Sequence, residues 1–309
     1  MKFIQFLQTI SNWTQNYAFR ILLIVLVIAL LGAQTVTNQA SALSRYAPTV
    51  TNVSYSPNEL PPVITTGVKA NNMANTTGGS GYCEYGACYY WATMADYGIT
   101  AAGASVSITQ AQPKVGPNDL HSLAELAVES YNGQQVVEIG WLVAPGINQD
   151  SLTHLFVYHW VNGAETCYNG CGFVPTTTTY TAGGLVKVNT VGTYSIHYGN
   201  SKWIIRYDGV ELGYFPESIW GGTFTKTSLV QTFGEVASSS ATTPLTQMGN
   251  GLFGTKTNSA RISNFNLIGT KNTRLLDYSA DQAPAVYTIG HYNSSCKLSC
   301  GMNFGGPGY

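Results

Sequence analysis

The sequence contains few charged residues, and neither sign predominates. Only 9% of its 309 residues are charged, with 14 Lys and Arg against 15 Asp and Glu, whereas a soluble domain typically has about 25%. No basic stretch is available to contact phosphate groups. We therefore expect neither nucleic acid nor an anionic membrane surface as a partner.

Motifs for several catalytic mechanisms are also missing. There is no Gly-x-Ser-x-Gly elbow of the kind that a serine hydrolase needs. The Gly-rich run at residues 78–81 is followed by no Lys-Ser/Thr, which argues against a phosphate-binding loop. The five histidines, which show neither His-x-His nor HExxH spacing, are His121, His154, His159, His197 and His291. We expect no metal and no cofactor.

The residues that are abundant are typical of an exported, β-rich protein. Hydrophobic residues make up 44% of the chain and aromatic residues 12%, which is enough for a core and argues against overall disorder. The chain also has 33 Gly and 20 Tyr.

The N-terminal segment resembles a signal peptide. Ile21–Ala33 is an uninterrupted run of small and apolar residues within the roughly 7–15 residues of a signal-peptide core and short of the roughly 20 that span a bilayer. Lys2 and Arg20 precede this run, and Ala40–Ala42 supplies a small-residue cleavage site. The alternative is an uncleaved anchor, which would keep the protein at the cell surface.

Three segments follow from this interpretation. Residues 1–42 are the signal peptide, and residues 43–81 are a Pro-, Asn- and Thr-rich linker or short pro-segment with too few periodic apolar positions for a core. Residues 82–309 form a single domain. We expect the mature protein to be secreted, monomeric and free of the membrane.

The six cysteines occur as three close sequence pairs, namely Cys83 and Cys88, Cys167 and Cys171, and Cys296 and Cys300. An even number of cysteines in an exported chain indicates disulfides, and the local clustering favours three short loops. A zinc site would need Cys-x-x-Cys pairs or histidines at ligand spacing, which the chain lacks.

From Tyr82 onward, apolar and polar residues alternate with a period of two, and turn residues recur. The clearest case is Thr193–Phe215, an antiparallel meander with turns at Gly199-Asn200 and Asp208-Gly209. Leu120–Val128 is the one stretch in which a helical period competes with the period of two. Further strands are expected at Gly103–Thr109, Gln134–Val143, His154–Val161, Val186–Val188, Ser228–Ala237, Phe265–Leu267 and Val286–His291. The pattern predicts an all-β fold, an antiparallel β-sandwich.

Two glutamates lie in unusually apolar strands. Alternation places Glu138 on one face of its strand with Gly140, and Trp141 on the opposite face. Glu235 shares its face with Gln231 and follows Gly234. Burial would raise the pKa of a glutamate, as a general acid requires. The alternative for each is a structural carboxylate, exposed to solvent or paired with Arg.

Seven motifs, each weak by itself, occur in one order: YGITAAGASVSITQAQPKV, SLAEL with VESYNGQQVVEIGWLVAP, HLFVYHWVNGAETCYNGCGFV, WIIRYDGVELGYFPESIW, FGEV, TQMGNG and FGGPGY. In this order the chain, from about Tyr89 to its C-terminus, resembles the neprosin family of glutamic peptidases. The resemblance implies a lectin- or jelly-roll-like sandwich of two curved sheets, and it carries the two catalytic glutamates of the family onto Glu138 and Glu235. The chain departs from plant members in its shorter N-terminal region and in lacking the terminal Cys.

The resemblance also implies a mechanism and a polypeptide substrate. One glutamate, ionised, would take a proton from water, while the other, protonated, would polarise the scissile carbonyl. Such a pair predicts an acidic optimum at about pH 3–5. A preference for prolyl bonds is associated with the family, but two glutamates alone do not imply it.

Substrate-binding candidates are Gln231, on the face of Glu235, and Tyr158 and Trp160 in the neighbouring strand, whereas Trp141 is expected in the core. Two other classes of function stay open at this point. A lectin-like or cell-surface module would use aromatic residues to stack on sugars, and a glycosidase would use two carboxylates roughly 5–10 Å apart.

Overall fold

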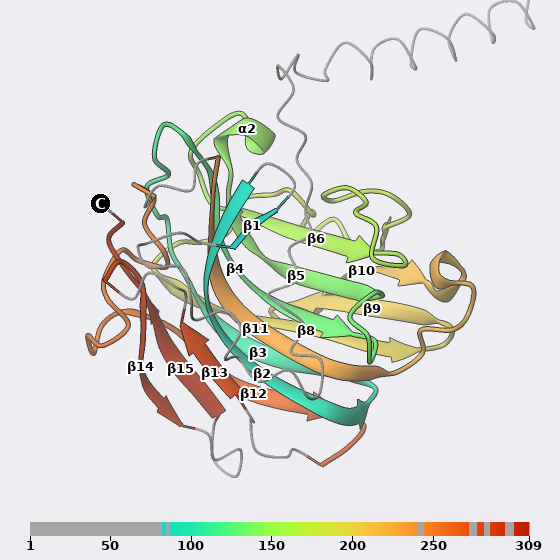
Figure 1. Cartoon of the computed structure of the whole chain (residues 1–309). Coiled ribbons are helices and arrows are strands. Elements are labelled where there is room, and N and C mark those ends of the chain that lie inside the picture. Colours follow the sequence, from blue (N-terminus) through green and yellow to red (C-terminus); the bar gives the residue numbers. More distant parts are fainter. Residues whose placement is uncertain are drawn as a thin grey trace, which may run out of the picture. The chain divides into compact units, whose positions relative to one another are not determined.

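The computed structural model describes residues 82–84, 87–239, 244–271, 277–280, 285–293 and 300–308 (Figure 1). All of them lie in Ser54–Tyr309, one of the two units into which the chain divides. The expected signal peptide, the expected linker and Cys296 lie outside the described residues. Among those residues, none belongs to a helix long and apolar enough to cross a bilayer.

The described residues form strands with two short helical turns. The elements are β1 (Tyr82–Glu84), β2 (Ala87–Ala101), β3 (Gly103–Gln110), β4 (Asp119–Glu129), β5 (Val136–Val143), α2 (Pro145–Asn148), β6 (His154–Trp160), β7 (Val174–Pro175), β8 (Thr190–Gly199), β9 (Lys202–Tyr207), β10 (Val210–Pro216), the 3₁₀ helix η2 (Glu217–Trp220), β11 (Thr227–Ser238), β12 (Ala260–Ile268), β13 (Asp277–Ala280), β14 (Thr288–Asn293) and β15 (Cys300–Gly305).

The strands form two antiparallel sheets (Figure 1). Sheet A has the order β1-β2-β11-β4-β5-β6, with β13 also paired to β2, and sheet B has the order β14-β15-β12-β3-β8-β9-β10-β7. The long strands β2 and β11 bend visibly along their length. The expected all-β sandwich is therefore confirmed.

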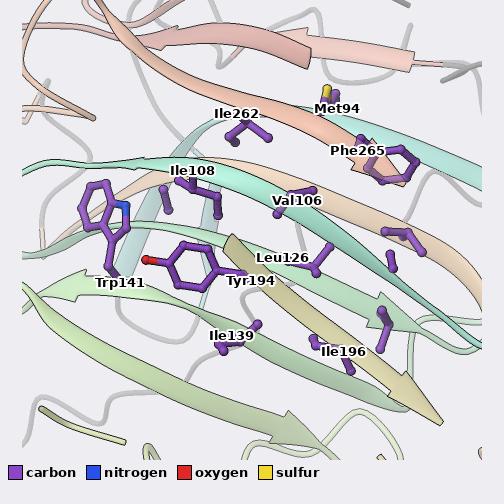
Figure 2. Packing of buried hydrophobic residues seen from close by; sticks show 14 of the residues in the cluster. Met94, Val106, Ile108, Leu126, Ile139, Trp141, Tyr194, Ile196, Ile262 and Phe265 are labelled. Atoms are coloured by element: carbon purple, nitrogen blue, oxygen red, sulfur yellow. The ribbon is translucent and has the colours of Figure 1, made fainter. Parts of the chain in front are cut away.

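The core lies between the two sheets (Figure 2). Leu126 and Ile139 from sheet A pack against side chains such as Val106 and Ile196 from sheet B. Trp141 is fully buried in this cluster, as alternation predicted, and its indole N–H donates to the carbonyl of Thr109 over 2.9 Å.

The meander is confirmed, with one shift in a turn. Residues 190–216 form β8, β9 and β10, joined by the two-residue turns Asn200-Ser201 and Asp208-Gly209. All four turn residues have positive φ, as type I′ hairpin turns require. The first turn therefore begins one residue later than predicted.

Three sequence-based expectations need correction. Leu120–Val128, where a helix competed, lies wholly within strand β4. Val186–Val188 is loop, although Val186 is buried and donates its N–H to Thr153. The strands β2 and β15 were not expected, because both faces of each are buried and alternation of polarity is therefore absent.

Sheet A also has a second buried face, which we call the outer face because it points away from sheet B. Alternate residues of β4, β5, β6 and β11 form a separate apolar cluster there, namely Leu123, Ala127, Val136, Leu142, Phe156, Tyr158, Trp160 and Phe233, together with Ala144. The Glu138 and Glu235 side chains belong to this face by alternation.

The free edge of sheet A at β6 is covered by the segment that follows it. Leu155 exchanges backbone hydrogen bonds with Gly183 and Gly184, each 2.7 Å long. Val157 donates its N–H to the side chain of Asn169 and accepts from the backbone N–H of Asn169, both over 3.0 Å. The backbone groups that β6 directs outward at these two residues are thus satisfied.

Candidate active site

Glu138 and Gln231 lie in the same row across sheet A. On the strand between them, Ala127 pairs with Glu138 of β5 on one side and with Gln231 of β11 on the other. Two strand spacings separate their backbones by about 10 Å. Because the residue between them is alanine, the side chain on the intervening strand is a single methyl group.

Glu138 is buried among aromatic side chains. It is 2% exposed, and its Oε1 accepts a hydrogen bond from the indole N–H of Trp160 over 2.9 Å. Tyr158 pairs directly with Glu138 in the register of β5 and β6. The hydroxyl of Tyr158 accepts the backbone N–H of Thr166 over 3.0 Å.

Glu235 has a different partner. Its Oε1 lies 2.9 Å from Nε2 of His121, and both side chains are 1% exposed. His121 is on β4, opposite Ala237. The row of Ala237 and His121 lies farther from Gln231 than the row of Glu235 does. The contact with His121 therefore directs the Glu235 carboxyl away from Gln231.

The structure does not bring the carboxyls of Glu138 and Glu235 together. They share a face, but β4 lies between their strands and the two rows are four residues apart along β11. Strand spacing and rise put their backbones about 16 Å apart. Trp160 and His121 lie on opposite sides of this gap, so the two hydrogen bonds direct the carboxyls away from each other.

Two further glutamates of β4 lie beside Glu138, and sequence reasoning missed both. Glu125 and Glu129 flank Ala127 on the outer face, so each is diagonal to Glu138, at a distance of about 7–8 Å between α-carbons. Both are buried. Period-two alternation through β4 would have indicated them if Leu120–Val128 had been recognised as a strand.

The protonation of Glu129 differs from that of a free glutamate side chain. Complete burial raises the pKa of Glu129 to about 8, although the hydrogen bond from Gln231 opposes this rise. At neutral and acidic pH the carboxyl is therefore protonated and uncharged. A neutral group here also avoids a second negative charge beside Glu138.

Glycines allow close packing on both sides of sheet A. A β-carbon on Gly140 would lie 2.7 Å from Cβ of Glu125, and one on Gly234 would lie 2.2 Å from the ring of Phe304. The space beside Gly140 is thus filled by the neighbouring strand. Gly234 instead allows a side chain of sheet B to contact β11.

An aromatic group extends from β6 into the loop that follows it. The rings of Tyr158 and Tyr168 lie 4.8 Å apart, and Tyr168 also contacts Phe156. Tyr168 is held within the small loop closed by the Cys167–Cys171 disulfide. This disulfide, predicted from the sequence, therefore fixes a residue that packs on the outer face.

The other expected disulfides are described in part. Cys88 and Cys300 are both disulfide-bonded. Cys83 lies opposite Cys88 in the register of β1 and β2. The pairing of Cys300 with Cys296 stays a prediction, because Cys296 lies outside the described residues.

The described part of the chain contains no group of three or more His, Cys, Asp or Glu side chains that could hold a metal ion. On the outer face it offers the carboxyls of four glutamates, the imidazole of His121, the carboxamide of Gln231 and the polar groups of aromatic residues. Such groups can transfer protons and donate hydrogen bonds to a developing negative charge.

Several solved structures are similar to this chain at low identity. Scytalido-glutamic peptidase, crystallised with a peptide-based transition-state analogue, has 7% identity and a TM-score of 0.40, over 70% of this chain and 98% of that chain. An endo-glucanase of glycoside hydrolase family 16 from Bacteroides ovatus has 14% identity and a TM-score of 0.31, over 49% and 67%. Chicken galectin 2 has 7% identity and a TM-score of 0.30, over 46% and 92%.

The family comparison is more specific than these structures. The model of the Neprosin family matches residues 118–307, which is more than half of the chain. The match begins just before β4 and includes β5 and β11, so Glu138, Gln231 and Glu235 all fall inside it. The chain belongs to the Neprosin family.

Proposed function

We propose that the protein is an endopeptidase that hydrolyses peptide bonds at the outer face of sheet A, with Glu138 as the proton-transferring residue. Membership of the Neprosin family supports a peptidase-type hydrolase with a polypeptide substrate. The observation that carries the assignment is the row Glu138–Ala127–Gln231, in which a buried carboxyl and a buried carboxamide belong to the same face of sheet A.

The proposed reaction is direct attack by water. Glu138, ionised, takes a proton from water as its oxygen bonds to the scissile carbonyl carbon. An N–H of Gln231 stabilises the negative charge that develops on the carbonyl oxygen. Glu138 then gives its proton to the leaving nitrogen as the carbon–nitrogen bond breaks.

Glu235 is the second catalytic glutamate that the family resemblance implies. To act on the same peptide bond as Glu138, its carboxyl would have to leave His121 and turn along β11 past Phe233. Gln231 already lies in the row of Glu138 and needs no such movement. We therefore favour Gln231 as the group opposite Glu138 and treat Glu235 as the alternative that the variants below distinguish.

The substrate we propose is an extended polypeptide that lies across the strands. Tyr158 and Trp160 place aromatic rings beside Glu138, and both side chains are buried. A preference for proline is a further proposal, which product analysis can decide.

We also propose that the protein acts outside the cell. The proposal rests on the apolar run Ile21–Ala33 followed by the small residues Ala40–Ala42, and on the disulfide of Cys167 with Cys171.

The test is digestion of a denatured, unlabelled protein by the purified chain between pH 3 and 9, with fragments identified by mass spectrometry. Peptide fragments that appear with the wild type and are reduced at least 100-fold with Glu138→Gln would support the proposal. Glu211→Gln is a matched control, because it makes the same change on sheet B, where Glu211 bonds Arg206.

Two results would overturn the proposal. One is an active Glu138→Gln variant, and the other is absence of fragments at every pH. Parallel incubation with β-glucans would then test the glycosidase alternative, and binding to immobilised sugars would test the lectin-like one.

A further inference from the structure

Glu129 is the last residue of β4. Its side chain is fully buried, and its backbone N–H donates to the hydroxyl of Thr227 over 3.0 Å. The same hydroxyl lies 2.6 Å from the backbone carbonyl of Leu229 and 3.0 Å from that of Glu129, and its single proton can go to one of them. The backbone N–H of Glu129 is thus held by Thr227.

The Glu129 carboxyl holds the Gln231 side chain. Nε2 of Gln231 donates to Oε1 of Glu129 over 2.8 Å. The bond turns the nitrogen of the carboxamide toward Glu129, so its oxygen lies on the other side of the group. One N–H is used by this contact, and the oxygen and second N–H remain to bond water or substrate.

We propose that Glu129 is a positioning residue that sets the orientation of the Gln231 carboxamide opposite Glu138. The inference rests on the proposed function only for its kinetic consequence, since the hydrogen bond itself is a property of the fold. A carboxamide can otherwise rotate and exchange its oxygen and nitrogen, which would present the wrong group to a developing negative charge.

The protonation of Glu129 fits this role. The titratable group that faces it is Glu138 from β5, whereas Glu125 lies four residues away on its own strand and β11 presents Gln231 and Leu229. With a pKa of about 8, a neutral Glu129 accepts from Gln231 without adding a second charge beside Glu138.

The kinetic test compares Glu129→Gln with Glu129→Leu in the full chain. Glutamine keeps a carbonyl that accepts from Gln231, so kcat should stay within about threefold of wild type, whereas leucine should lower kcat about tenfold or more with little change in KM. In a Gln231→Ala background, the leucine substitution should have no further effect on kcat. An unchanged kcat for Glu129→Leu, or independent effects in the double variant, would overturn the proposal.

A second measurement is independent of activity and of the stability of the leucine variant. In protein labelled with ¹⁵N-glutamine, the side-chain amide signal of Gln231 is assigned by its loss in Gln231→Ala. That signal should shift near pH 8 in the wild type and stay constant in Glu129→Gln. A Gln231 signal at the same position in the wild type and in Glu129→Gln would refute the contact, whereas absence of peptide cleavage with a signal that differs between them would refute only the proposed function.

Discussion

The indole N–H of Trp160 donates to Oε1 of Glu138 across the neighbouring strands β6 and β5. Trp160 is opposite Val136, so the bond is diagonal and directs the Glu138 carboxyl along the face of sheet A. The bond engages one of the two carboxyl oxygens of Glu138.

Replacing Trp160 with phenylalanine tests this relationship. Phe keeps aromatic packing against Tyr158 but removes the donor, so we expect kcat to fall about three- to tenfold with less change in KM. Steady-state kinetics on a peptide substrate measure the effect. Trp203→Phe is the control, because its N–H donates to Phe224 within the core, and it should affect stability rather than kcat.

The identity of the residue opposite Glu138 can be tested with three variants. We expect Glu138→Gln to lower kcat by about 10² or more and Gln231→Ala by about 10-fold to 100-fold. Their combination should be far from additive, because both act on one transition state.

Glu235→Gln separates the two assignments of the second catalytic group. Gln keeps an oxygen that can accept from His121, so the fold should be retained, and we expect kcat to change less than about tenfold. A fall of about 100-fold or more without loss of stability would instead support the pair of glutamates that the family resemblance implies.

Stability should depend on pH through Glu129. Its pKa is about 8 in the folded chain and near 4.5 in the unfolded chain. The unfolded state therefore binds fewer protons between these values, and the free energy of unfolding should fall as pH rises, by up to about 1.4 kcal/mol per pH unit.

The interval from pH 6.5 to 8 is the cleanest for this measurement. Burial lowers the pKa of His159 to about 4 from 6.5, so between these two values His159 makes the fold more stable as pH rises. Above pH 6.5 the contribution of Glu129 remains. Urea unfolding should show the decrease in the wild type and a flatter profile in Glu129→Gln; equal slopes would contradict the assignment.

The Cys167–Cys171 disulfide should matter for the loop more than for the sandwich. Its short loop predicts a stabilisation of about 2 kcal/mol or less. Replacing both cysteines with serine should therefore leave the far-UV circular dichroism unchanged while increasing hydrogen exchange around Asn169. Loss of the β-sheet spectrum would show that the disulfide is needed for folding.

Export predicts a defined N-terminus. If residues 1–42 are a cleaved signal peptide, N-terminal sequencing of the natively produced protein should begin between Ser41 and Arg45. Recovery of a chain that begins at Met1 in a membrane fraction would indicate an anchor instead.

Local pattern was sufficient to predict the faces of β5 but not the arrangement of the site. Alternation separates Glu138 from Trp141 within one strand, and the structure has them on opposite faces. Which residue lies across from Glu138 depends on the insertion of β4 between β5 and β11, a pairing between segments distant in sequence. Alternation within one strand carries no information about that register.

The strand β4 was ambiguous for a physical reason. Both of its faces are buried and apolar, with Leu123 and Ala127 on one face and Leu126 and Val128 on the other. The sequence therefore lacks the contrast in polarity that marks a half-exposed strand. Glu125 and Glu129 were hidden by the same ambiguity.

The covered edge of β6 limits how a peptide can approach. Many proteins bind an extended chain by adding it as a further strand at an open sheet edge. An added strand cannot pair with Leu155 or Val157, because their outward backbone N–H and C=O groups are already hydrogen-bonded. The partners are Gly183, Gly184 and Asn169. On the proposed function, a chain cut at Glu138 would therefore cross over the strands and be held by its side chains, so sequence preference should depend more on residue type than on backbone pairing.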